Sequence, residues 1–402
     1  MHQIEETYFL SVAAPVIIDS NGGRWCNELW AKDLALHLDY IANLTLGCPC
    51  EFREPNEFDV SMDEPPFDRI RYIDLPNPRN HVEALLNLPR LIARMWQGVR
   101  SCKIVHTGFG GWPVSEGWLA VPMGKVLGRF IITNVESSFW RTKSHASRIH
   151  RVRSTVIECI NRFCVRIADL RLFTSRSYAE EFLPGTKERV YVVPATWIDA
   201  KIILGIDEAR DSWASKRGCV RLLFAGRLIA DKGVRVLIDA LRFVANHYKS
   251  PLEIVIIGSG ELLHECSDLV REIQSSSVRV TLLEPVSYGK PFLNLLRGFD
   301  AILVPSLSAE QPRLIFDAFS QAVPVLGSNT GGICEVVRDQ VNGRIYRQGD
   351  AAALAAMLNW ASGNREALQA MGMNALNDCE HFTHRAMHKA RQEILLKELA
   401  RT

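Results

Sequence analysis

Short apolar runs alternate with longer amphipathic stretches along this chain of 402 residues. Several of the runs lack the every-other-residue alternation of a half-exposed strand, as expected of strands that are covered on both faces. The stretches between them repeat apolar residues at helical spacing. The predicted strands are Phe9–Ile18, Ile104–His106, Phe130–Asn134, Leu170–Phe173 and Arg189–Val193, then Arg221–Ala225, Leu252–Ile257, Val278–Leu283, Ala301–Val304 and Val323–Leu326. The predicted helices are Trp25–Tyr40, His81–Val99, Ser147–Ile167, Val234–His247, Glu261–Ser275, Tyr288–Leu296, Arg313–Gln321 and Ala351–Asn359.

This strand–helix–strand repetition predicts right-handed crossovers and a doubly wound parallel sheet. The repetition occurs twice, and the chain is too long for one ordinary core, so we predict two Rossmann-like α/β domains. The boundary is expected in the charged stretch Asp199–Lys216, which gives an N-terminal domain at 1–200 and a C-terminal domain at 217–379. The tail Glu380–Thr402 is predicted to be helical, and Cys48–Pro78, rich in Pro, Asp and Glu, is predicted to be a long loop or small excursion.

Composition narrows the class of protein. Hydrophobic residues make up 47% of the chain and charged residues 23%, which is typical of a soluble globular protein. The net charge of +2 gives no global attraction to nucleic acid or to an anionic membrane. We therefore expect no nucleic-acid partner, and any membrane contact must come from a local patch.

The N-terminus contains an apolar run, Tyr8–Ile18, that could pass for the core of a signal peptide. The residues before it are acidic rather than basic, and no run reaches the roughly 18 apolar residues of a membrane-spanning helix. We interpret it as a buried first strand, in a protein that is neither exported by this route nor integral to the membrane. The ten cysteines are scattered, and Cys48 and Cys50 have no second half of a zinc site at a usable spacing. A cytoplasmic protein with buried, reduced thiols is expected.

The first chemical motif is FAGRLIADKG, Phe224–Gly233. An apolar strand ends at Ala225, Gly226 permits a sharp turn, and Arg227 and Lys232 precede the next helix. Arginine offers a planar fork to phosphate oxygens and lysine a point charge, so the pair could neutralise a diphosphate without a metal. The alternative is two solvated cations at a strand–helix junction.

The second motif is VIIGSG, Val255–Gly260. Gly258 and Gly260 follow a buried strand, where glycine lets the backbone approach a ligand and leaves N–H groups available. A plain turn is an equally good interpretation of this motif alone.

The third motif is PSLSAEQPRLIFDAFSQAVPVLGSNTGGICEVV, Pro305–Val337. It places Glu310 in a loop and Asp317 on the following helix, and a carboxylate can accept two hydrogen bonds from the vicinal hydroxyls of a ribose or sugar ring. The pair Gly331–Gly332 can present backbone donors to a phosphate. Alternatively, Glu310 and Asp317 stabilise a helix start, as Glu335 could in the first turn of the next helix.

Together, the three motifs resemble the nucleotide-sugar-binding half of family 4 of the retaining glycosyltransferases with the GT-B fold, also called glycosyl transferases group 1. The resemblance covers roughly Leu222–Leu354. It implies two Rossmann-like doubly wound domains facing a cleft, with the C-terminal helix at 380–402 returning to the N-terminal domain. Arg227 and Lys232 match the family's diphosphate-binding pair, and the glycines of the second motif match those near the nucleotide.

The family's third motif has two glutamates separated by seven residues, with Gly-Phe-Gly after the first. Asp317 matches the second glutamate, which holds the ribose. The position of the first glutamate, which contacts the donor sugar, falls on Ala309, one residue before Glu310. Gln311-Pro312-Arg313 replaces the usual glycines, and this departure could alter which donor sugar fits.

The N-terminal half carries weaker signals. Gly22 and Gly23, between the first strand and a helix, resemble the family's glycine loop that faces the diphosphate. Family members often carry a histidine after a strand near donor sugar and acceptor, and His106 ends one such strand. Glu136 follows another and is assigned an acceptor- or sugar-binding role, with a structural glutamate as the alternative. Trp112, Trp118 and Trp140 could stack on sugar faces, although tryptophan is more often a core residue.

The segment 141–176 is strongly basic. Val152, Val156, Ile160, Phe163 and Ile167 would form the apolar face of a helix in it. Such a helix can lie on anionic lipid, or it can be an ordinary docked helix with a solvated basic face. The first alternative would place the protein peripherally at the inner face of the membrane.

The chain has no D-x-D metal motif, no Walker A loop and no G-x-S-x-G elbow. The resemblance therefore implies a metal-independent hexosyltransferase-type enzyme without a cofactor. It would move a sugar from a nucleoside diphosphate sugar to the hydroxyl of a carbohydrate or lipid-linked acceptor, with retention. Two alternatives stay open: another GT-B enzyme, such as a nucleotide-sugar epimerase, and a non-catalytic subunit that binds the nucleotide sugar.

Overall fold

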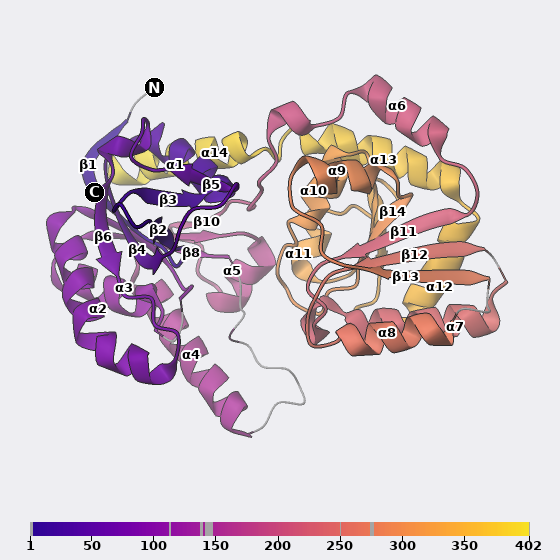
Figure 1. Ribbon diagram of the computed structural model, residues 1–402, viewed down its shortest axis with the longest axis horizontal. Helices are drawn as coiled ribbons and strands as arrows, with labels where there is room; N and C mark the ends of the chain where they lie inside the picture. Colours follow the sequence, from indigo (N-terminus) through magenta and orange to yellow (C-terminus); the bar gives the residue numbers. More distant parts are fainter. Residues whose placement is uncertain are drawn as a thin grey trace. The chain divides into compact units, whose positions relative to one another are not determined.

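The computed structural model describes residues 3–111, 114–136, 140, 148–249, 251–273 and 277–401. The chain divides into two compact units. The N-terminal unit comprises Met1–Thr174, Ala179–Val193 and Met387–Thr402, and the C-terminal unit comprises Ser175–Tyr178 and Pro194–Ala386 (Figure 1). The chain passes between units at Val193–Pro194, before the stretch expected to hold the boundary. That stretch contains helix α6, Ile206–Ser215, of the C-terminal unit.

The N-terminal unit contains a parallel sheet with the strand order β10-β9-β8-β7-β1-β4, and β6 pairs with β4. Its strands are β1 Ile4–Ser11, β4 Ile41–Phe52, β6 Arg71–Leu75, β7 Ile104–Gly108, β8 Phe130–Val135, β9 Leu170–Phe173 and β10 Val190–Val192. Three short strands extend it beyond β4: β2 Val16–Ile18, β3 Arg24–Asn27 and β5 Asp59–Ser61. Because β1, β7 and β8 are neighbours, Leu10, His106 and Ile132 lie side by side near their carboxyl ends.

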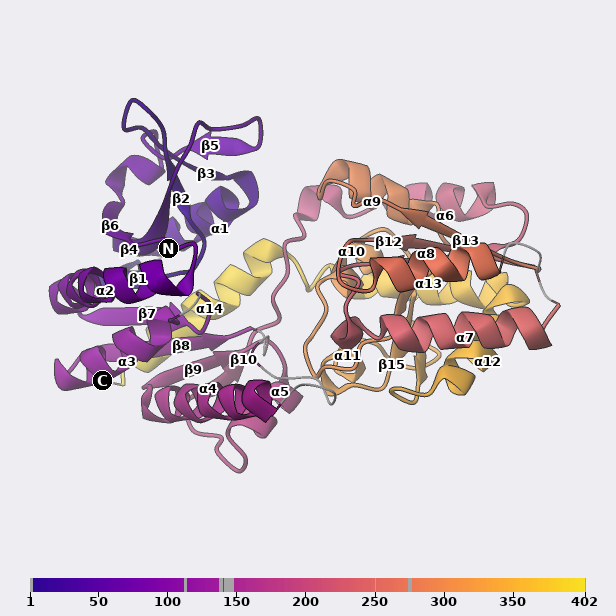
Figure 2. The same cartoon turned by 60° about the horizontal axis from the view of Figure 1, so that its bottom comes forward.

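Helices cover both faces of this sheet, because successive strand residues point to opposite faces. Tyr8 and Leu10 pack in one core with Leu34 of α1, Glu28–Leu38, and with Leu395 of α14, His384–Leu399. Phe9 faces the other core. That face carries α2 His81–Ser101, α3 Glu116–Val126 and α4 Arg148–Ile167. Helix α3 contacts both α2 and α4, so the three form one layer (Figure 2).

Two expectations for this half are wrong. The single strand predicted at Phe9–Ile18 is two strands, β1 and β2, separated by Val12–Pro15. For Cys48–Pro78, the long-loop alternative is wrong, since the region holds the end of β4 and all of β5 and β6, and the alternative of a small excursion remains. Strand β4, IANLTLGCPCEF, was missed because Gly, Pro and Cys interrupt its apolar pattern. Pro49 is accommodated where β4 pairs with the last residue of β6, Leu75.

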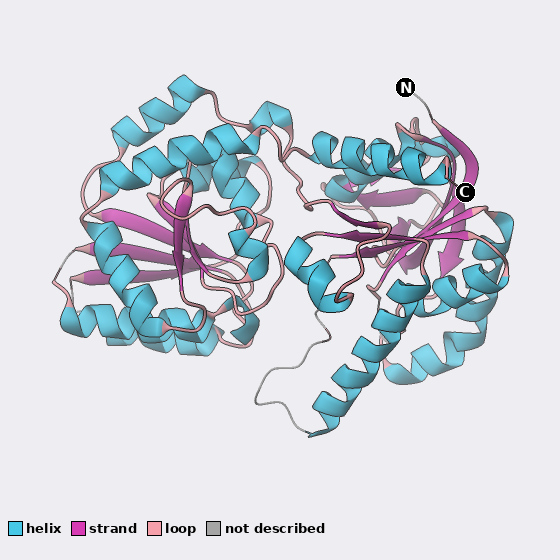
Figure 3. Ribbon diagram, turned by 180° about the vertical axis from the view of Figure 1, so that it is seen from behind, coloured by secondary structure: helices cyan, strands magenta, loops and turns pink. Residues whose placement is uncertain are grey.

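The C-terminal unit contains a six-stranded, all-parallel sheet in the order β13-β12-β11-β14-β15-β16 (Figure 3). The strands are β11 Val220–Ala225, β12 Leu252–Ile257, β13 Val278–Leu283, β14 Ala301–Val304, β15 Val325–Ser328 and β16 Gly343–Tyr346. Its other helices are α7 Val234–His247, α8 Leu263–Glu272, α9 Lys290–Arg297, α10 Leu314–Ser320, α11 Gly331–Cys334, α12 Ala351–Ser362 and α13 Arg365–Cys379. All five strands predicted here are present, and β16 is an additional one.

Successive side chains of β11 point to opposite faces of the sheet, and helices cover both faces. Leu222 and Phe224 pack with α7, α8 and α12, whereas Leu223 packs with α9, α10 and α13. The two doubly covered parallel sheets confirm the predicted fold class of two Rossmann-like α/β domains. Seven of the ten cysteines are buried and all ten are free thiols. Within the described residues, no helix has the length and apolar content needed to cross a membrane.

Candidate functional site

A pocket of about 340 Å³ lies at the carboxyl ends of β11, β12 and β13 in the C-terminal unit. Parallel strands end at the same edge, so the loops that follow them meet there. Gly226 and Arg227 follow β11, Gly258 and Ser259 follow β12, and Tyr288 follows β13; Leu314 and Asp317 of α10 also line the pocket. The structure therefore brings together residues of all three sequence motifs.

Asp317, the predicted ribose ligand, is 5% exposed and lines this pocket. Its Oδ1 accepts a hydrogen bond of 2.8 Å from the Tyr288 hydroxyl. Burial raises the pKa of Asp317 to about 7, although the Tyr288 hydrogen bond and the nearby Arg313 oppose the shift. A buried carboxylate with unused lone pairs can accept further hydrogen bonds from ligand hydroxyls.

Glycines let the loops after β11 and β12 pack directly against each other. A Cβ on Gly258 would lie 1.9 Å from the carbonyl oxygen of Gly226, and one on Gly260 would lie 2.5 Å from that of Leu228. No side chain fits at either position, since both contacts are with backbone. Gly258 lines the pocket, whereas Gly260 is not one of its lining residues.

The predicted diphosphate cations have different surroundings. Arg227 is exposed at the pocket. Lys232 ends the turn after β11 and forms an ion pair with Glu310, with 3.1 Å between Nζ and Oε2. Gly233 makes this approach of the two loops possible, because a Cβ there would lie 1.7 Å from the carbonyl oxygen of Pro305. Two residues predicted separately, 78 positions apart, are thus direct partners.

The glycine pair Gly331–Gly332 begins the short helix α11 and lies against the Glu310 loop. A Cβ on Gly332 would lie 2.4 Å from the carbonyl oxygen of Glu310. Glu335 does not stabilise the first turn of this helix. It is the residue after the last turn, and its carboxylate accepts hydrogen bonds of 2.7 Å from the backbone N–H groups of Arg176 and Ser177.

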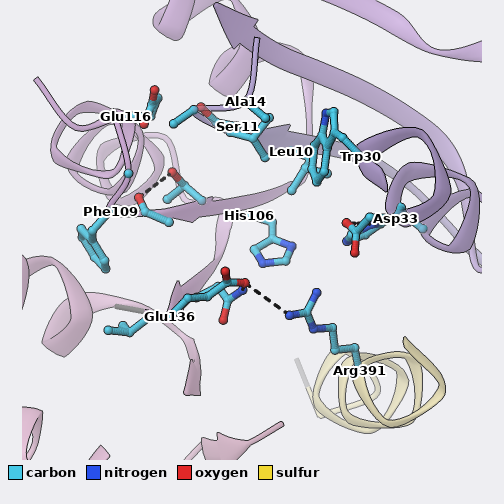
Figure 4. Close-up of a pocket in the computed structure, with 18 residues that line it drawn as sticks. Leu10, Ser11, Ala14, Trp30, Asp33, His106, Phe109, Glu116, Glu136 and Arg391 are labelled. Carbon is cyan, nitrogen blue, oxygen red and sulfur yellow. Dashed lines mark hydrogen bonds and ion pairs between the residues drawn. The ribbon is translucent and has the colours of Figure 1, made fainter. Parts of the chain in front are cut away.

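A second pocket, of about 260 Å³, lies at the carboxyl ends of β1, β7 and β8 in the N-terminal unit (Figure 4). It brings His106 and Glu136 together, as two adjacent strand ends predict. Other lining residues were not predicted: Ser11 at the end of β1, Trp30 and Asp33 from α1, Phe109 after β7, Glu116 from α3 and Arg391 from α14.

Electrostatics in this pocket are set mainly by burial. His106 is 4% exposed and its Nδ1 lies 2.8 Å from the Tyr8 hydroxyl. Burial lowers the pKa of His106 well below its ordinary value, and neighbouring His37 and Arg391 act in the same direction. Burial raises the pKa of Glu116 to about 7. The pocket therefore holds a neutral imidazole and a carboxyl group that titrates near neutrality.

Glu136 stands at the pocket between two partners. Its Oε1 accepts a hydrogen bond of 2.8 Å from Asn134 Nδ2 and lies 3.6 Å from Arg391 Nη2. Arg391 is 5% exposed and reaches the pocket from the C-terminal helix, as Figure 4 shows. The Glu136 carboxylate keeps lone pairs for a ligand.

Gly22 and Gly23 are not in a loop that leads from a strand directly to a helix. They lie in the hairpin turn between the antiparallel strands β2 and β3. Asp19 holds this turn through hydrogen bonds from the backbone N–H of Asn21 and Gly23 and from the Trp25 indole. Neither glycine lines the N-terminal pocket.

Two of the three tryptophans considered as sugar platforms contact α4. The indole N–H groups of Trp118 and Trp140 donate to Asn161 and Glu158 at 2.6 Å. Trp112 and positions 141–147 of the basic segment lie outside the described residues. In the predicted apolar face of α4, Val152, Val156 and Phe163 are exposed, whereas Ile160 and Ile167 are half-buried, so only part of this face is covered.

Sequence reasoning missed Tyr288, Trp30, Glu116 and Arg391. Tyr288 follows a predicted strand, so its place at a strand end was the available signal. Trp30, Glu116 and Arg391 lie on helices, and no motif marks them. Only the packing of α1, α3 and α14 around the ends of β1, β7 and β8 brings them together.

Comparison with known structures identifies the class of fold. Sucrose-phosphate synthase from Thermosynechococcus elongatus is similar over 99% of this chain and 100% of that one, with a TM-score of 0.72 and 16% sequence identity. Anabaena HepE, solved in complex with UDP-glucose, is similar over 98% of this chain and 100% of that one, with a TM-score of 0.65 and 16% identity. The chain has the GT-B fold of glycosyltransferases.

The family-model match lies in the C-terminal unit. Residues 219–364 match the family model of Glycosyl transferases group 1. The amylovoran biosynthesis glycosyltransferase of Erwinia amylovora is 30% identical over 146 residues, which are 35% of each chain. The chain spans about a third of the length of the first curated relatives it matches. The matched segment contains all the residues that line the C-terminal pocket.

Proposed function

We propose that this protein is a glycosyltransferase that moves a sugar from a nucleoside diphosphate sugar to an acceptor hydroxyl. The observation that carries the proposal is the C-terminal pocket itself. It places an exposed cation, Arg227, and a buried carboxylate, Asp317, around one cavity inside the segment that matches Glycosyl transferases group 1. A nucleoside diphosphate carries anionic phosphates and a ribose diol, which this pair complements.

Arg227 and Lys232 stabilise the negative charge that develops on the departing diphosphate. Asp317 accepts hydrogen bonds from the ribose, with Tyr288 holding its carboxylate. Glu310 orients the donor sugar. Since that sugar is bonded directly to the second phosphate, its ligand must lie near the phosphate cations, and the 3.1 Å contact between Lys232 and Glu310 supports this assignment.

The glycines contribute through their backbone. Gly258, Gly260, Gly331 and Gly332 allow the loops around the nucleotide to approach one another. The N–H groups of Gly260, Gly331 and Gly332 are the proposed phosphate donors, whereas that of Gly258 donates to the Leu283 carbonyl. Diphosphate binding by the Gly22–Gly23 turn stays a prediction.

The reaction is proposed to retain the anomeric configuration and to need no metal ion. The two cations would neutralise the charge of the diphosphate, as a divalent ion does in metal-dependent transferases. In the retaining route, the leaving phosphate takes the proton of the acceptor hydroxyl on the same face of the sugar. The segment 217–379 then binds the donor, and 1–200 binds a carbohydrate or lipid-linked acceptor through Glu136, with the 380–402 helix packed on it.

A donor panel tests the proposal. Purified protein is incubated with UDP-, GDP-, ADP- and TDP-sugars, with and without EDTA, and thermal shift and nucleoside diphosphate release are measured. Stabilisation by one donor with slow, EDTA-insensitive release is expected. No shift with any donor would remove Arg227 and Asp317 from a nucleotide site. Binding without release, persisting through a broad acceptor screen, would favour a non-catalytic binding subunit, and a new free nucleotide sugar would favour an epimerase.

We also propose that α4 contacts an anionic membrane surface. Ile149 is 81% exposed, and Val152 and Phe163 are 64% and 57% exposed. Helical spacing places them with Val156 in one stripe along α4. Exposed arginines flank the stripe at positions 148, 151, 153 and 166. An apolar stripe between cations fits a bilayer interface with anionic headgroups.

Vesicle sedimentation tests this contact. Binding to phosphatidylglycerol-containing vesicles and little binding to pure phosphatidylcholine are expected. Val152→Asp and Phe163→Asp should abolish the binding, while Leu263→Asp, a matched change at an exposed apolar residue of α8, should not. Equal binding by all three variants would refute the assignment to α4.

A further inference from the structure

The N-terminal pocket contains buried polar atoms that the protein does not satisfy. Within the described chain, Ser11 Oγ, Trp30 Nε1 and Arg391 Nε are buried and have no hydrogen-bond partner, and all three residues line this pocket. Ser11 is 1% exposed. Buried polar groups in folded proteins are normally paired, because leaving one unpaired costs the free energy of its desolvation. Three such groups around one cavity point to a ligand with several acceptor atoms.

The charges around the pocket limit what that ligand is. Asp33, Glu116 and Glu136 line it, and Arg391 is the one described lining residue with a permanent positive charge. The guanidinium of Arg391 already lies 3.6 Å from the Glu136 carboxylate. Burial keeps the His106 imidazole neutral by lowering its pKa. A phosphate or carboxylate group would therefore meet three acids in the lining, and the one permanent cation of the described lining is already engaged by one of them.

The remaining features suit a ring of hydroxyl groups. Hydroxyls accept from Ser11, Trp30 and Arg391 and donate to Glu136, so they satisfy both kinds of group at once. The apolar side chains of Leu10, Phe109 and Ala14 also line the cavity and can cover the C–H face of a sugar (Figure 4). The volume of about 260 Å³ is below the roughly 300 Å³ at which pockets for drug-sized ligands begin, so one ring fits.

We propose that this pocket binds a neutral, polyhydroxylated ring of the acceptor, with Ser11, Trp30 and Arg391 as donors to its oxygens and Glu136 as acceptor from its hydroxyls. The inference rests on the proposed transferase function and specifies its acceptor class. It selects a neutral sugar or polyol, free or at the end of a longer acceptor, against a phosphorylated ring.

Ligand-observed saturation-transfer NMR tests this without a donor. The probes are neutral compounds (methyl glucosides, galactosides and mannosides, N-acetylglucosamine and myo-inositol) and the phosphate esters of the same rings. At least one neutral compound is expected to bind the wild-type protein, and its phosphate ester is expected to bind more weakly. Stronger binding of the esters, or no binding of any neutral compound, would overturn the proposal.

Two variants assign the binding to this pocket. Ser11→Ala and Trp30→Phe should each weaken binding of the neutral ring about tenfold, through loss of one hydrogen bond. Trp25→Phe is the matched control, since that indole donates to Asp19 and does not line the pocket. Binding unchanged in Ser11→Ala and Trp30→Phe would refute the assignment.

Thermal unfolding separates this role from a structural one. Because Ser11 Oγ and Trp30 Nε1 lack partners in the protein, Ser11→Ala and Trp30→Phe should not lower the unfolding temperature through a lost hydrogen bond. Donor binding is measured on the same preparations. Intact donor binding without ring binding would refute this inference alone, and ring binding without donor binding would refute the donor site alone.

Discussion

The two pockets of this molecule occupy equivalent edges of similar sheets but are assembled differently. The C-terminal pocket is lined by residues between Ala225 and Asp317, from successive strand-end loops and the helices α9 and α10. The N-terminal pocket draws on residues from Leu10 to Arg391, and three helices contribute as well as three strand ends. The C-terminal pocket is therefore built from a shorter stretch of the sequence. The N-terminal pocket depends on the C-terminal helix α14, which packs in the N-terminal unit.

The two pockets also differ in the charge of the residues around them. Around the C-terminal pocket, an exposed arginine and a paired lysine face a ligand expected to carry two phosphates. In the N-terminal pocket, the one arginine among the described lining residues is matched by acids. A site for an anionic ligand needs cations next to glycine turns, and these residues form a recognisable motif in the sequence. A site for a neutral ligand needs hydrogen-bond donors that can come from distant segments, so no sequence motif marks it.

The largest effect is expected from Lys232→Met. Loss of this cation removes stabilisation of the leaving diphosphate, so kcat should fall about 100-fold to 1,000-fold. Single-turnover kinetics with the identified donor measure it. Lys249→Met, at an exposed lysine of the same unit, should leave kcat unchanged. A normal kcat in Lys232→Met would contradict the proposal that the C-terminal pocket, unlike the N-terminal one, acts through a cation on a charged ligand.

Asp317→Ala should come next. Loss of a charged hydrogen-bond acceptor should weaken nucleotide binding by about 1–3 kcal/mol, measured by calorimetry with the nucleoside diphosphate. Acceptor-ring binding in the N-terminal pocket should not change. Asp239→Ala, at an exposed position of α7, is the control. Full nucleotide affinity in a folded Asp317→Ala variant would exclude this residue from the donor site.

Glu136→Gln should affect only acceptor binding in the N-terminal pocket. We expect a rise of about tenfold in KM for the acceptor, because a charged acceptor of hydroxyl hydrogen bonds becomes neutral. Donor affinity should stay constant, and the exposed Glu180→Gln should behave as wild type. A change confined to donor affinity would show that Glu136 serves the donor rather than the acceptor.

The smallest effect concerns pH. The pKa of Asp317 is about 7 in the folded protein, above its usual 3.8, so the carboxylate becomes fully available as the pH rises through 7. Nucleotide affinity should increase about threefold between pH 6 and pH 8, which is most of the roughly 1 kcal/mol between a neutral and a charged acceptor. Asp317→Asn should lose that part of the increase, leaving only the titration of the diphosphate itself.

The same pKa makes a linked prediction for stability. Because the folded-state pKa of Asp317 lies above the unfolded value, its protonation stabilises the fold below about pH 4. That contribution is lost as the pH rises from 4 to 7. Denaturant unfolding of wild type and Asp317→Asn across this range measures it, and parallel pH profiles would contradict the assigned pKa.

The sequence predicted the elements whose formation depends mainly on neighbouring residues in the chain. The apolar runs at Arg221–Ala225 and Leu252–Ile257 match β11 and β12 closely, since a strand covered on both faces is apolar along most of its length. Strand β4 was missed because its pattern is interrupted, and its pairing with β1 and β6 supplies what the local sequence lacks. The partnership of Lys232 and Glu310 could not be foreseen, because their loops follow different strands.

From the sequence alone one can predict the alternation of strands and helices, the two doubly wound sheets, the strand ends that carry Arg227, His106 and Glu136, and the helix that carries Asp317. Local periodicity and the chemistry of single residues are sufficient for these features. Three features depend on tertiary packing: Tyr288 contacts Asp317, Trp30 and Arg391 line one pocket, and the apolar stripe of α4 is exposed. Those outcomes depend on which distant segments pack together, and the free energy that fixes the packing comes from the whole core rather than from the residues of the site.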